Sequence, residues 1–335
     1  MRILIDAMGG DNAPREIVHG ALMAAREYKI EPVLVGRKEE ILSVSESHPE
    51  YADIESTVID AREVVTMDDN PASVMQEKKD ASMTVALRAL ANGEGDALVS
   101  AGSTGALLIQ STLIAKRIKG IRRAALSPLL PTENGKALLI DCGANAECTP
   151  EYLLQFAYMG AYYMENVFNV KNPRVGLLNI GTEPHKGDKL RQAAFELLSG
   201  TGERINFIGN IESRDVLYGA ADVIVTDGFT GNILLKAIEG AGLYFARELK
   251  GIFMKSVLTK LSALMVSGGI RGFKRKFDYN ETGGAPLLGI SKPVIKAHGS
   301  ANAVAFKNAI GQAYEFVNTG IIGKIEKDIG FMTEG

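Results

Sequence analysis

Residues 96–108 have the sequence DALVSAGSTGALL, and this short segment already indicates a fold class. Its first part, 96–100, is a brief apolar run of the kind that forms a buried strand. The next residues, 101–105, combine glycines with hydroxyl side chains and lead into a helical pattern over 104–117. A buried strand, a glycine-rich turn and a helix form the unit from which parallel α/β folds are built.

The same unit recurs along most of the chain. Strand patterns occupy 2–6, 32–35, 96–100, 137–141, 174–179, 205–208, 222–226 and 293–297. Helical patterns occupy 14–28, 82–92, 104–117, 150–165, 188–199, 231–250 and 300–318. Apolar strands separated by helices predict a mostly parallel sheet that is covered on both faces. We expect one domain, 1–335, with a helical excursion inserted at 236–277, where the alternation stops.

Composition limits the class of protein. The 335 residues are 46% hydrophobic and 23% charged, which supports a sizeable globular core. The net charge of -3 does not favour nucleic acid as a partner. Two cysteines fit a reducing cytoplasm, and we find neither a signal peptide nor an apolar run long enough to span a membrane. Because the four histidines and two cysteines lack ligand spacing, we expect no metal site.

Five of the predicted strands end in turns suited to bind anions. These turns lie at 6–11, 101–106, 141–145, 180–187 and 227–232. Each can direct backbone N–H groups toward a ligand, and the start of the following helix favours negative charge. Neither a P-loop nor a dinucleotide-binding glycine motif is present, so we predict phosphate or a small phosphorylated group as ligand, without a cofactor. Tight strand-to-helix turns need glycine in any case, which is the alternative explanation for any single turn.

Longer segments carry a specific resemblance. They are DAMGGDNAP (6–14), SAGSTGALL (100–108), RIKGIRRAAL (117–126), RVGLLNIGTE (174–183), NFIGNIESRD (206–215), VIVTDGFTGN (223–232) and PVIKAHGSA (293–301). In this order they resemble the phosphate acyltransferase family of bacterial phospholipid synthesis. The resemblance implies a three-layer α/β/α sandwich, of the isocitrate-dehydrogenase-like and phosphotransacetylase-like type, and a homodimer. It also implies transfer of a fatty acyl group from acyl carrier protein to inorganic phosphate, giving acyl phosphate.

This reaction indicates which side chains to expect at the site. Phosphate is already an anion near pH 7, and a thiol with a pKa near 8.5 is a good leaving group, so no activated serine or cysteine is needed. The site must instead hold phosphate against the thioester and stabilise the developing oxyanion. We predict Lys186, Asn232 and His298 as catalytic residues. Lys186 and His298 lie in turns that follow strands, and Asn232 opens the helix after such a turn. A solvated lysine, a simple helix cap and a structural histidine are the respective alternatives.

The remaining predicted contacts are to phosphate. Ser103 and Thr104 offer hydroxyl groups, and the neighbouring turn positions offer backbone N–H groups. The predicted phosphate-binding residues are Gly102, Ser103, Thr104, Gly105, Gly181 and Thr182. His19 and His48 look structural.

The excursion carries an unusual charge. Residues 244–277 hold eight positive side chains and one negative side chain in a chain of net charge -3. Such a surface attracts acidic partners, and acyl carrier proteins are acidic. We therefore predict carrier docking at Arg271, Lys274 and Arg275, with anionic lipid at the inner face of the cell membrane as the second candidate partner. Apolar residues at helical spacing between Ile252 and Met265 predict a dimer face, an acyl-chain groove or a membrane-touching surface.

Three other functions stay open on the residues alone. A short-chain phosphate acyltransferase that uses coenzyme A would share these turns but would need a nucleotide pocket. A dehydrogenase of the same fold would need cofactor and metal sites, with clustered aspartates and arginines, and we find no such set. A non-catalytic lipid- or nucleic-acid-binding protein is the third, although the basic runs contain few interleaved aromatic residues.

Overall fold

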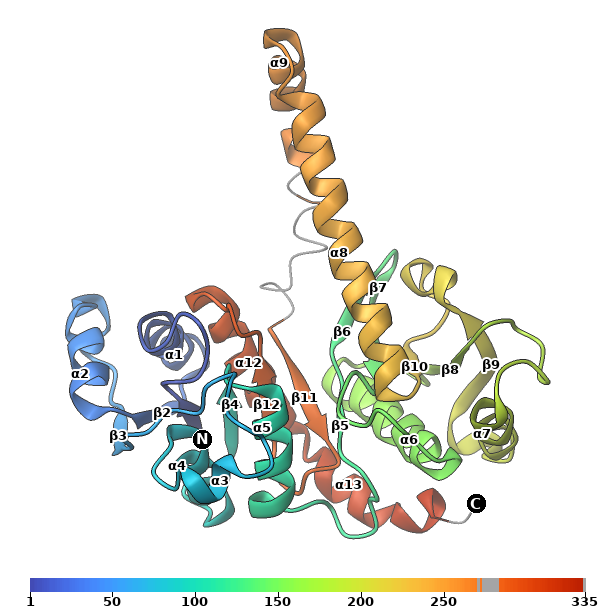
Figure 1. The fold of residues 1–335 in the computed structure, drawn as a ribbon, viewed down its shortest axis with the longest axis horizontal. Helices are drawn as coiled ribbons and strands as arrows, with labels where there is room; N and C mark the ends of the chain where they lie inside the picture. Colours follow the sequence, from blue (N-terminus) through green and yellow to red (C-terminus); the bar gives the residue numbers. More distant parts are fainter. Residues whose placement is uncertain (270–271, 273–282, 334–335) are drawn as a thin grey trace.

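A computed structural model describes residues 1–269, 272 and 283–333. The fold class is confirmed, but the strands form two sheets, a division that the sequence pattern did not predict (Figure 1). The seven-stranded sheet has the spatial order β3 (Thr57–Asp60), β2 (Glu31–Gly36), β1 (Arg2–Asp6), β4 (Ala97–Ser100), β12 (Val294–Ala297), β11 (Gly284–Leu288) and β5 (Ala125–Leu126). The five-stranded sheet has the order β6 (Leu129–Thr132), β7 (Gly135–Ile140), β10 (Val223–Val225), β8 (Arg174–Asn179) and β9 (Asn206–Glu212).

Most strand pairs are parallel, as predicted, and the antiparallel pairs involve short strands that the pattern missed. Strand β11 is antiparallel to both β12 and β5, and β6 is antiparallel to β7. The chain passes from the first sheet to the second through β5 and β6, which follow one another directly in the sequence. Two hydrogen bonds join this passage to the end of β7: Leu126 N–H donates to the Asp141 carboxylate at 2.9 Å, and Cys142 N–H donates to Leu126 O at 2.9 Å.

Helices cover both faces of the first sheet, in agreement with its apolar strands. The helices and short helical turns before the second sheet are α1 (Arg15–Tyr28), α2 (Lys38–Glu46), η1 (Pro49–Tyr51), α3 (Val74–Glu77), α4 (Ser82–Ala91), α5 (Thr104–Gln110) and η2 (Ser111–Ala115). Ile3 and Ile5 pack in a cluster with residues of α1 and α12 (Ala303–Thr319), whereas Leu4 packs in a second cluster with residues of α4. This alternation follows from the two-residue period of a strand.

The second sheet is covered in the same way. Its helices and the C-terminal ones are α6 (Pro150–Val167), α7 (Lys189–Ser199), η3 (Gly202–Arg204), η4 (Ser213–Tyr218), α8 (Gly228–Phe253), α9 (Val257–Met265), α13 (Ile321–Lys327) and η5 (Ile329–Met332). Val223 packs in the cluster that contains α6, and Ile224 packs in a third cluster that Leu234 of α8 partly covers. The cluster with α6 also contains Ile5, so one apolar core joins the two sheets.

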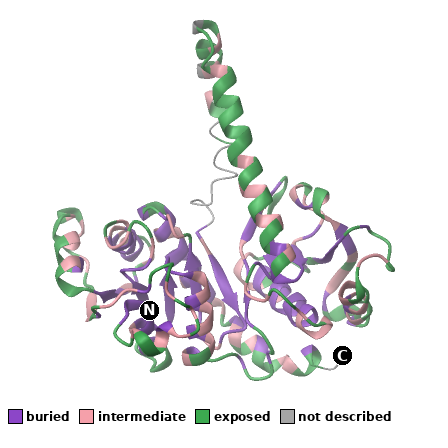
Figure 2. Ribbon diagram, in the orientation of Figure 1, coloured by how far each residue is buried: buried purple, intermediate pink, exposed green. Residues whose placement is uncertain are grey.

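Helix α8 leaves this body. Figure 1 shows it projecting away from both sheets, with α9 at its far end, and Figure 2 shows that most of its surface is exposed. Among its described residues only Gly228 and Gly231 are buried. The long helix therefore begins in the body of the protein and carries the predicted excursion outward. Along the described ranges, no helix combines the length and the apolar character required to cross a bilayer.

Candidate active site

The first part of the site lies at the carboxyl ends of β1, β4 and β12. These strands are neighbours and parallel, and Ser100 is in register with both Asp6 and Lys296. Their following turns consequently meet at one edge of the sheet. Asp11 N–H donates to Gly299 O at 2.8 Å, which ties the turn after β1 to the turn after β12.

A buried acid and a buried base lie beneath these turns. The Asp6 carboxylate accepts hydrogen bonds of 2.6 Å from the hydroxyls of Ser82 and Ser100. The Lys296 ammonium donates to Ala101 O at 3.2 Å and also to its neighbouring carbonyl, that of residue 297. Burial raises the pKa of Asp6 and lowers the pKa of Lys296 to about 8, and each charge partly opposes the shift of the other.

The turns approach this pair so closely that one position requires glycine. A Cβ atom at Gly9 would lie 2.4 Å from a carboxylate oxygen of Asp6 and 2.8 Å from Gly102 N. Gly102 N–H itself donates to the Ser100 hydroxyl at 3.1 Å, so this N–H group is occupied. Ser103 is buried just before α5, and within the described structure its hydroxyl does not cap that helix. The contacts to phosphate predicted for this turn stay predictions.

The second part of the site lies at the carboxyl ends of β7, β10 and β8, which are also parallel neighbours. The buried Asp141 carboxylate organises the turn after β7, because it accepts hydrogen bonds from the N–H groups of Cys142, Ala144 and Asn145. Gly228 N–H donates to Asn145 O at 2.8 Å and joins this turn to the start of α8. Asp227 caps α8 through Thr230 N–H at 2.9 Å.

Close packing at this edge also requires glycine. A Cβ atom at Gly231 would lie 2.0 Å from Asp141 O, so α8 can pass over the turn only with glycine there. Arg191 of α7 is largely buried and binds the Asp227 carboxylate and the Thr230 hydroxyl. This ion pair fixes the first turn of α8, and it helps keep the pKa of Asp227 low against the opposing effect of burial.

Lys186 and Asn232 both occur at this second edge. Lys186 lies in the turn after β8, and its half-exposed ammonium is 3.8 Å from the Glu183 carboxylate. Gly181 of the same turn is buried and Thr182 is exposed. Asn232 is exposed and lies one turn into α8, which begins at Gly228 rather than near Asn232 as predicted. It lies beside the turn after β7, since a Cβ atom at Gly143 would lie 3.8 Å from its Cβ. Lys186 and Asn232 lie at the edge of the five-stranded sheet, whereas His298 follows β12 of the seven-stranded sheet. The three predicted catalytic residues therefore do not share one sheet edge, and their roles stay predictions.

His298 belongs to the first edge, in the turn after β12. Its Nδ1 is 2.9 Å from the Ser300 hydroxyl and accepts a 3.3 Å hydrogen bond from Ser300 N–H, so the neutral ring carries its proton on Nε2. Partial burial and then the charge of Lys296 lower the pKa of His298. Lys236 and Glu239 of α8 also act on this pKa, which places the ring near that helix. Since Lys236 and Glu239 also act on the pKa of Cys142 at the second edge, α8 lies near both edges.

Sequence reasoning missed several of these residues and could not test others. Asp6, Asp141, Arg191 and Lys296 received no predicted role. A lysine inside the otherwise apolar run of β12 was the available signal for Lys296. The predicted docking residues Arg271, Lys274 and Arg275 lie outside the residues that the structure describes.

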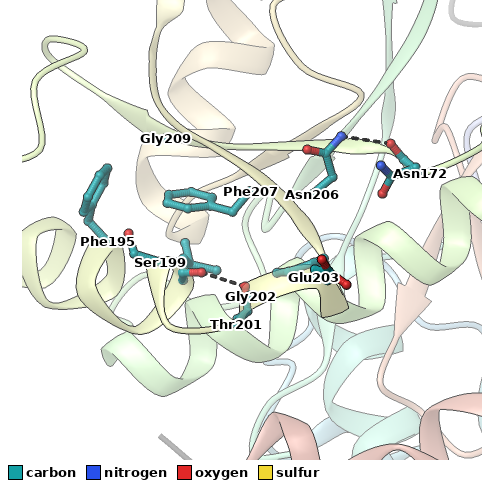
Figure 3. A pocket seen from close by; sticks show the side chains of 11 residues that line it. Asn172, Phe195, Ser199, Thr201, Gly202, Glu203, Asn206, Phe207 and Gly209 are labelled. Carbon is teal, nitrogen blue, oxygen red and sulfur yellow. Dashed lines mark hydrogen bonds between the residues drawn. The ribbon is translucent and has the colours of Figure 1, made fainter.

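A separate pocket lies between α7 and β9 (Figure 3). Its volume is about 660 Å³, and Phe195, Phe207 and Glu203 are among its lining residues. Two hydrogen bonds join residues that line it, from the Asn206 amide to Asn172 O at 3.1 Å and from the Thr201 hydroxyl to Leu198 O at 2.7 Å. None of the predicted site residues lines this pocket.

Comparisons with known proteins agree with this arrangement. The sequence profile of the family described as "Fatty acid synthesis protein" matches residues 1–324. A phosphate acyltransferase of Caldanaerobacter subterraneus subsp. tengcongensis is 47% identical over 330 residues, which cover 98% of this chain and 97% of that protein. A phosphate acyltransferase of Oceanobacillus iheyensis is 46% identical, over 98% of this chain and all of that protein (100%).

Solved structures share the fold. A phosphotransacetylase from Streptococcus pyogenes superposes with a TM-score of 0.65 at 19% identity and covers 94% of both chains. A branched-chain phosphotransacylase from Enterococcus faecalis V583 gives a TM-score of 0.57 at 15% identity, over 95% of this chain and 99% of that one. With nearly its whole length matched by the family profile and by relatives of this identity, the chain belongs to the fatty acid synthesis protein family.

Proposed function

We propose that this protein is a phosphate acyltransferase that moves a fatty acyl group from acyl carrier protein to inorganic phosphate, giving acyl phosphate for phospholipid synthesis. The observation that carries the proposal is the pair of polar strand-end edges, one with the buried Lys296 beneath it and one with Lys186 and Asn232. Both edges present cations, amides and N–H groups, which suit an anionic nucleophile and a developing oxyanion. The relatives named phosphate acyltransferase support the same activity.

Phosphate is proposed to bind at the first edge. The Ser103 hydroxyl and the backbone of Thr104 and Gly105 lie at the start of α5, and the Lys296 ammonium adds positive charge from below, whereas the Gly102 N–H is already bonded to Ser100. The Lys296 ammonium donates hydrogen bonds to two carbonyl oxygens, and its positive charge offsets part of the charge of the ligand in this proposal. His298 contributes a donor, the proton on Nε2, beside the same turn.

The acyl transfer itself needs one bond to form and one to break. A phosphate oxygen attacks the thioester carbonyl carbon, and the resulting oxyanion is stabilised by Lys186 and Asn232 in this proposal, together with the backbone at Gly181 and Thr182. The carbon–sulfur bond then breaks, and the carrier thiol leaves as a thiolate that takes a proton from solvent. Each protein group in this scheme binds or orients, so no covalent intermediate on the enzyme is required.

A phosphate-dependent thiol release tests the reaction. Purified protein and acyl-acyl carrier protein should release free carrier thiol only when phosphate is added, without metal or nucleotide. Hydroxylamine should trap the acyl phosphate as a hydroxamate in equal amount. Equal thiol release without phosphate would identify a thioesterase and refute the proposal, and a strict requirement for coenzyme A thioesters would favour the short-chain alternative.

The exposed α8 and α9 are proposed to bring the acyl carrier to this site. Described basic residues of this arm, among them Lys250, Lys255 and Lys260, are exposed and can attract an acidic carrier. Charge reversal at Arg271, Lys274 and Arg275 should raise the KM for the carrier thioester and flatten its salt dependence, with little change in the KM for phosphate. An unchanged KM for the carrier would remove docking from this segment.

The apolar stripe of the same arm is proposed to touch a membrane or a second copy of the chain. Leu258, Leu261 and Met265 are 76%, 54% and 88% exposed, which is unusual for large apolar side chains. A contact with anionic lipid would place a cytoplasmic enzyme beside the membrane that uses its product. A homodimer through the arm would bury the same side chains instead. Sedimentation with anionic vesicles, together with light scattering, separates the two cases.

A further inference from the structure

Two histidines and a carboxylate lie together away from the strand-end turns. His19 is in α1, whereas His48 directly precedes η1 and Glu50 lies within it. The two imidazole rings are 4.1 Å apart between centroids and tilted by 35°. One nitrogen of each ring and one oxygen of Glu50 all lie within 4.8 Å of one another.

The hydrogen bonds of His48 set its tautomer. Its Nδ1 lies 3.0 Å from Val44 O, and a carbonyl oxygen can only accept, so Nδ1 carries the proton. Nε2 therefore has a free lone pair in the neutral ring. A backbone carbonyl that accepts from one ring nitrogen while the other binds an ion is the usual second contact of a metal-ligating histidine.

We propose that His19, His48 and Glu50 form a binding site for a divalent transition metal ion, with Zn²⁺ as the best match. Two imidazole nitrogens and one carboxylate oxygen are a ligand set that zinc takes, with water in the fourth position. Ligands on a tetrahedral ion with bonds of about 2.1 Å are about 3.4 Å apart, so the three atoms must move closer by side-chain rotation. His19 and His48 are half-buried and Glu50 is exposed, which leaves room for that rotation.

Such an ion would tie α1 to the connection after α2. The ligands come from segments that are distant in the sequence, and α1 packs against both α2 and η1. A bound ion would therefore stabilise the folded state without taking part in acyl transfer, because it binds the folded chain in preference to the unfolded one.

Direct titration tests the site. The full-length protein, stripped with a chelator and kept in phosphate-free buffer, should bind one equivalent of Zn²⁺ in isothermal titration calorimetry. Removing a side chain that binds the metal should weaken binding at least as much as removing a group that only hydrogen-bonds such a side chain. His19→Gln and His48→Gln should therefore each lose on the order of 100-fold in affinity for zinc. Glu50→Gln should lose about 10-fold. Zinc should raise the Tm of the parent protein and not that of the histidine variants.

Matched controls exclude the other candidate ligands. His185→Gln removes an exposed histidine elsewhere and should bind zinc as the parent does. Cys148→Ala should also bind normally, and Co²⁺ bound to the parent should show d–d bands without a thiolate charge-transfer band. That spectrum tests the ligand set even if a histidine variant fails to fold. Binding that is not saturable at one equivalent, or equal affinity in the parent and His48→Gln, would overturn the proposal.

Discussion

Replacing Lys296 by methionine should remove a buried charge and with it a pH dependence of stability. The pKa of Lys296 falls from 10.5 to about 8 in the folded chain because the side chain is only 8% exposed. At 1.36 kcal/mol for each factor of ten, this fall corresponds to about 3 kcal/mol. The folded state bears this cost wherever the ammonium is protonated in both states, that is, below about pH 8.

The sign follows from the protons bound in each state. Between about pH 8 and 10.5 the unfolded chain keeps the proton on Lys296 while the folded chain has released it. Stability therefore rises with pH in this window. In Lys296→Met the rise should be smaller by up to about 3 kcal/mol, measured as the free energy of unfolding in urea at pH 7.5 and pH 10. The readout is the difference between the free energies of unfolding at the two pH values, because loss of the hydrogen bonds to Ala101 and Ala297 shifts both free energies together.

The same variant should lose activity. If the ammonium holds phosphate, Lys296→Met should lower kcat/KM for phosphate on the order of 100-fold in the thiol-release assay. The parent should lose activity above about pH 8 as Lys296 deprotonates, whereas Lys296→Arg should lack this decline because arginine stays charged. Parent-like phosphate kinetics in Lys296→Met, together with an unchanged pH dependence of unfolding, would refute the reasoning.

Three further results are expected. Lys186→Ala should lower turnover on the order of 100-fold with little change in Tm, because its ammonium is half-exposed and only loosely paired with an acid; turnover equal to that of the parent would make it a surface lysine. Cys142→Ala and Cys148→Ala should both stay active, since burial raises the pKa of each thiol to about 12 and no thiolate is available near pH 7; an inactive yet folded variant would contradict a direct transfer. Leu258→Gln combined with Leu261→Gln should reduce sedimentation with anionic vesicles, and a shift to monomer in light scattering instead would assign the stripe to a dimer.

The fold class was predictable because its determinants are local. Each long apolar strand that the pattern predicted is present, since a strand buried on both faces must be apolar throughout. Four strands were missed: β3, β5, β6 and β11. Strands β3, β5 and β6 have four residues or fewer, and β6 and β11 each contain a proline, so none carries a strong pattern. The helix predicted over 104–117 ends as a π-helical turn after Gln110, a change of hydrogen-bonding pattern that hydrophobic period does not detect.

The sequence by itself determined which turns follow the strands and hence which side chains lie at the strand ends. Lys186, Asn232 and His298 were predicted in this way, because the turns after parallel strands gather at the carboxyl edge of their own sheet whatever the strand order. The tertiary structure alone determined that the strand ends form two edges, because the strands divide into two sheets. It also determined the burial that moves the pKa of Lys296 and the approach of His19 to His48. Burial and proximity of this kind depend on the packing of segments distant in the sequence, and hydrophobic period and turn chemistry act only over neighbouring residues.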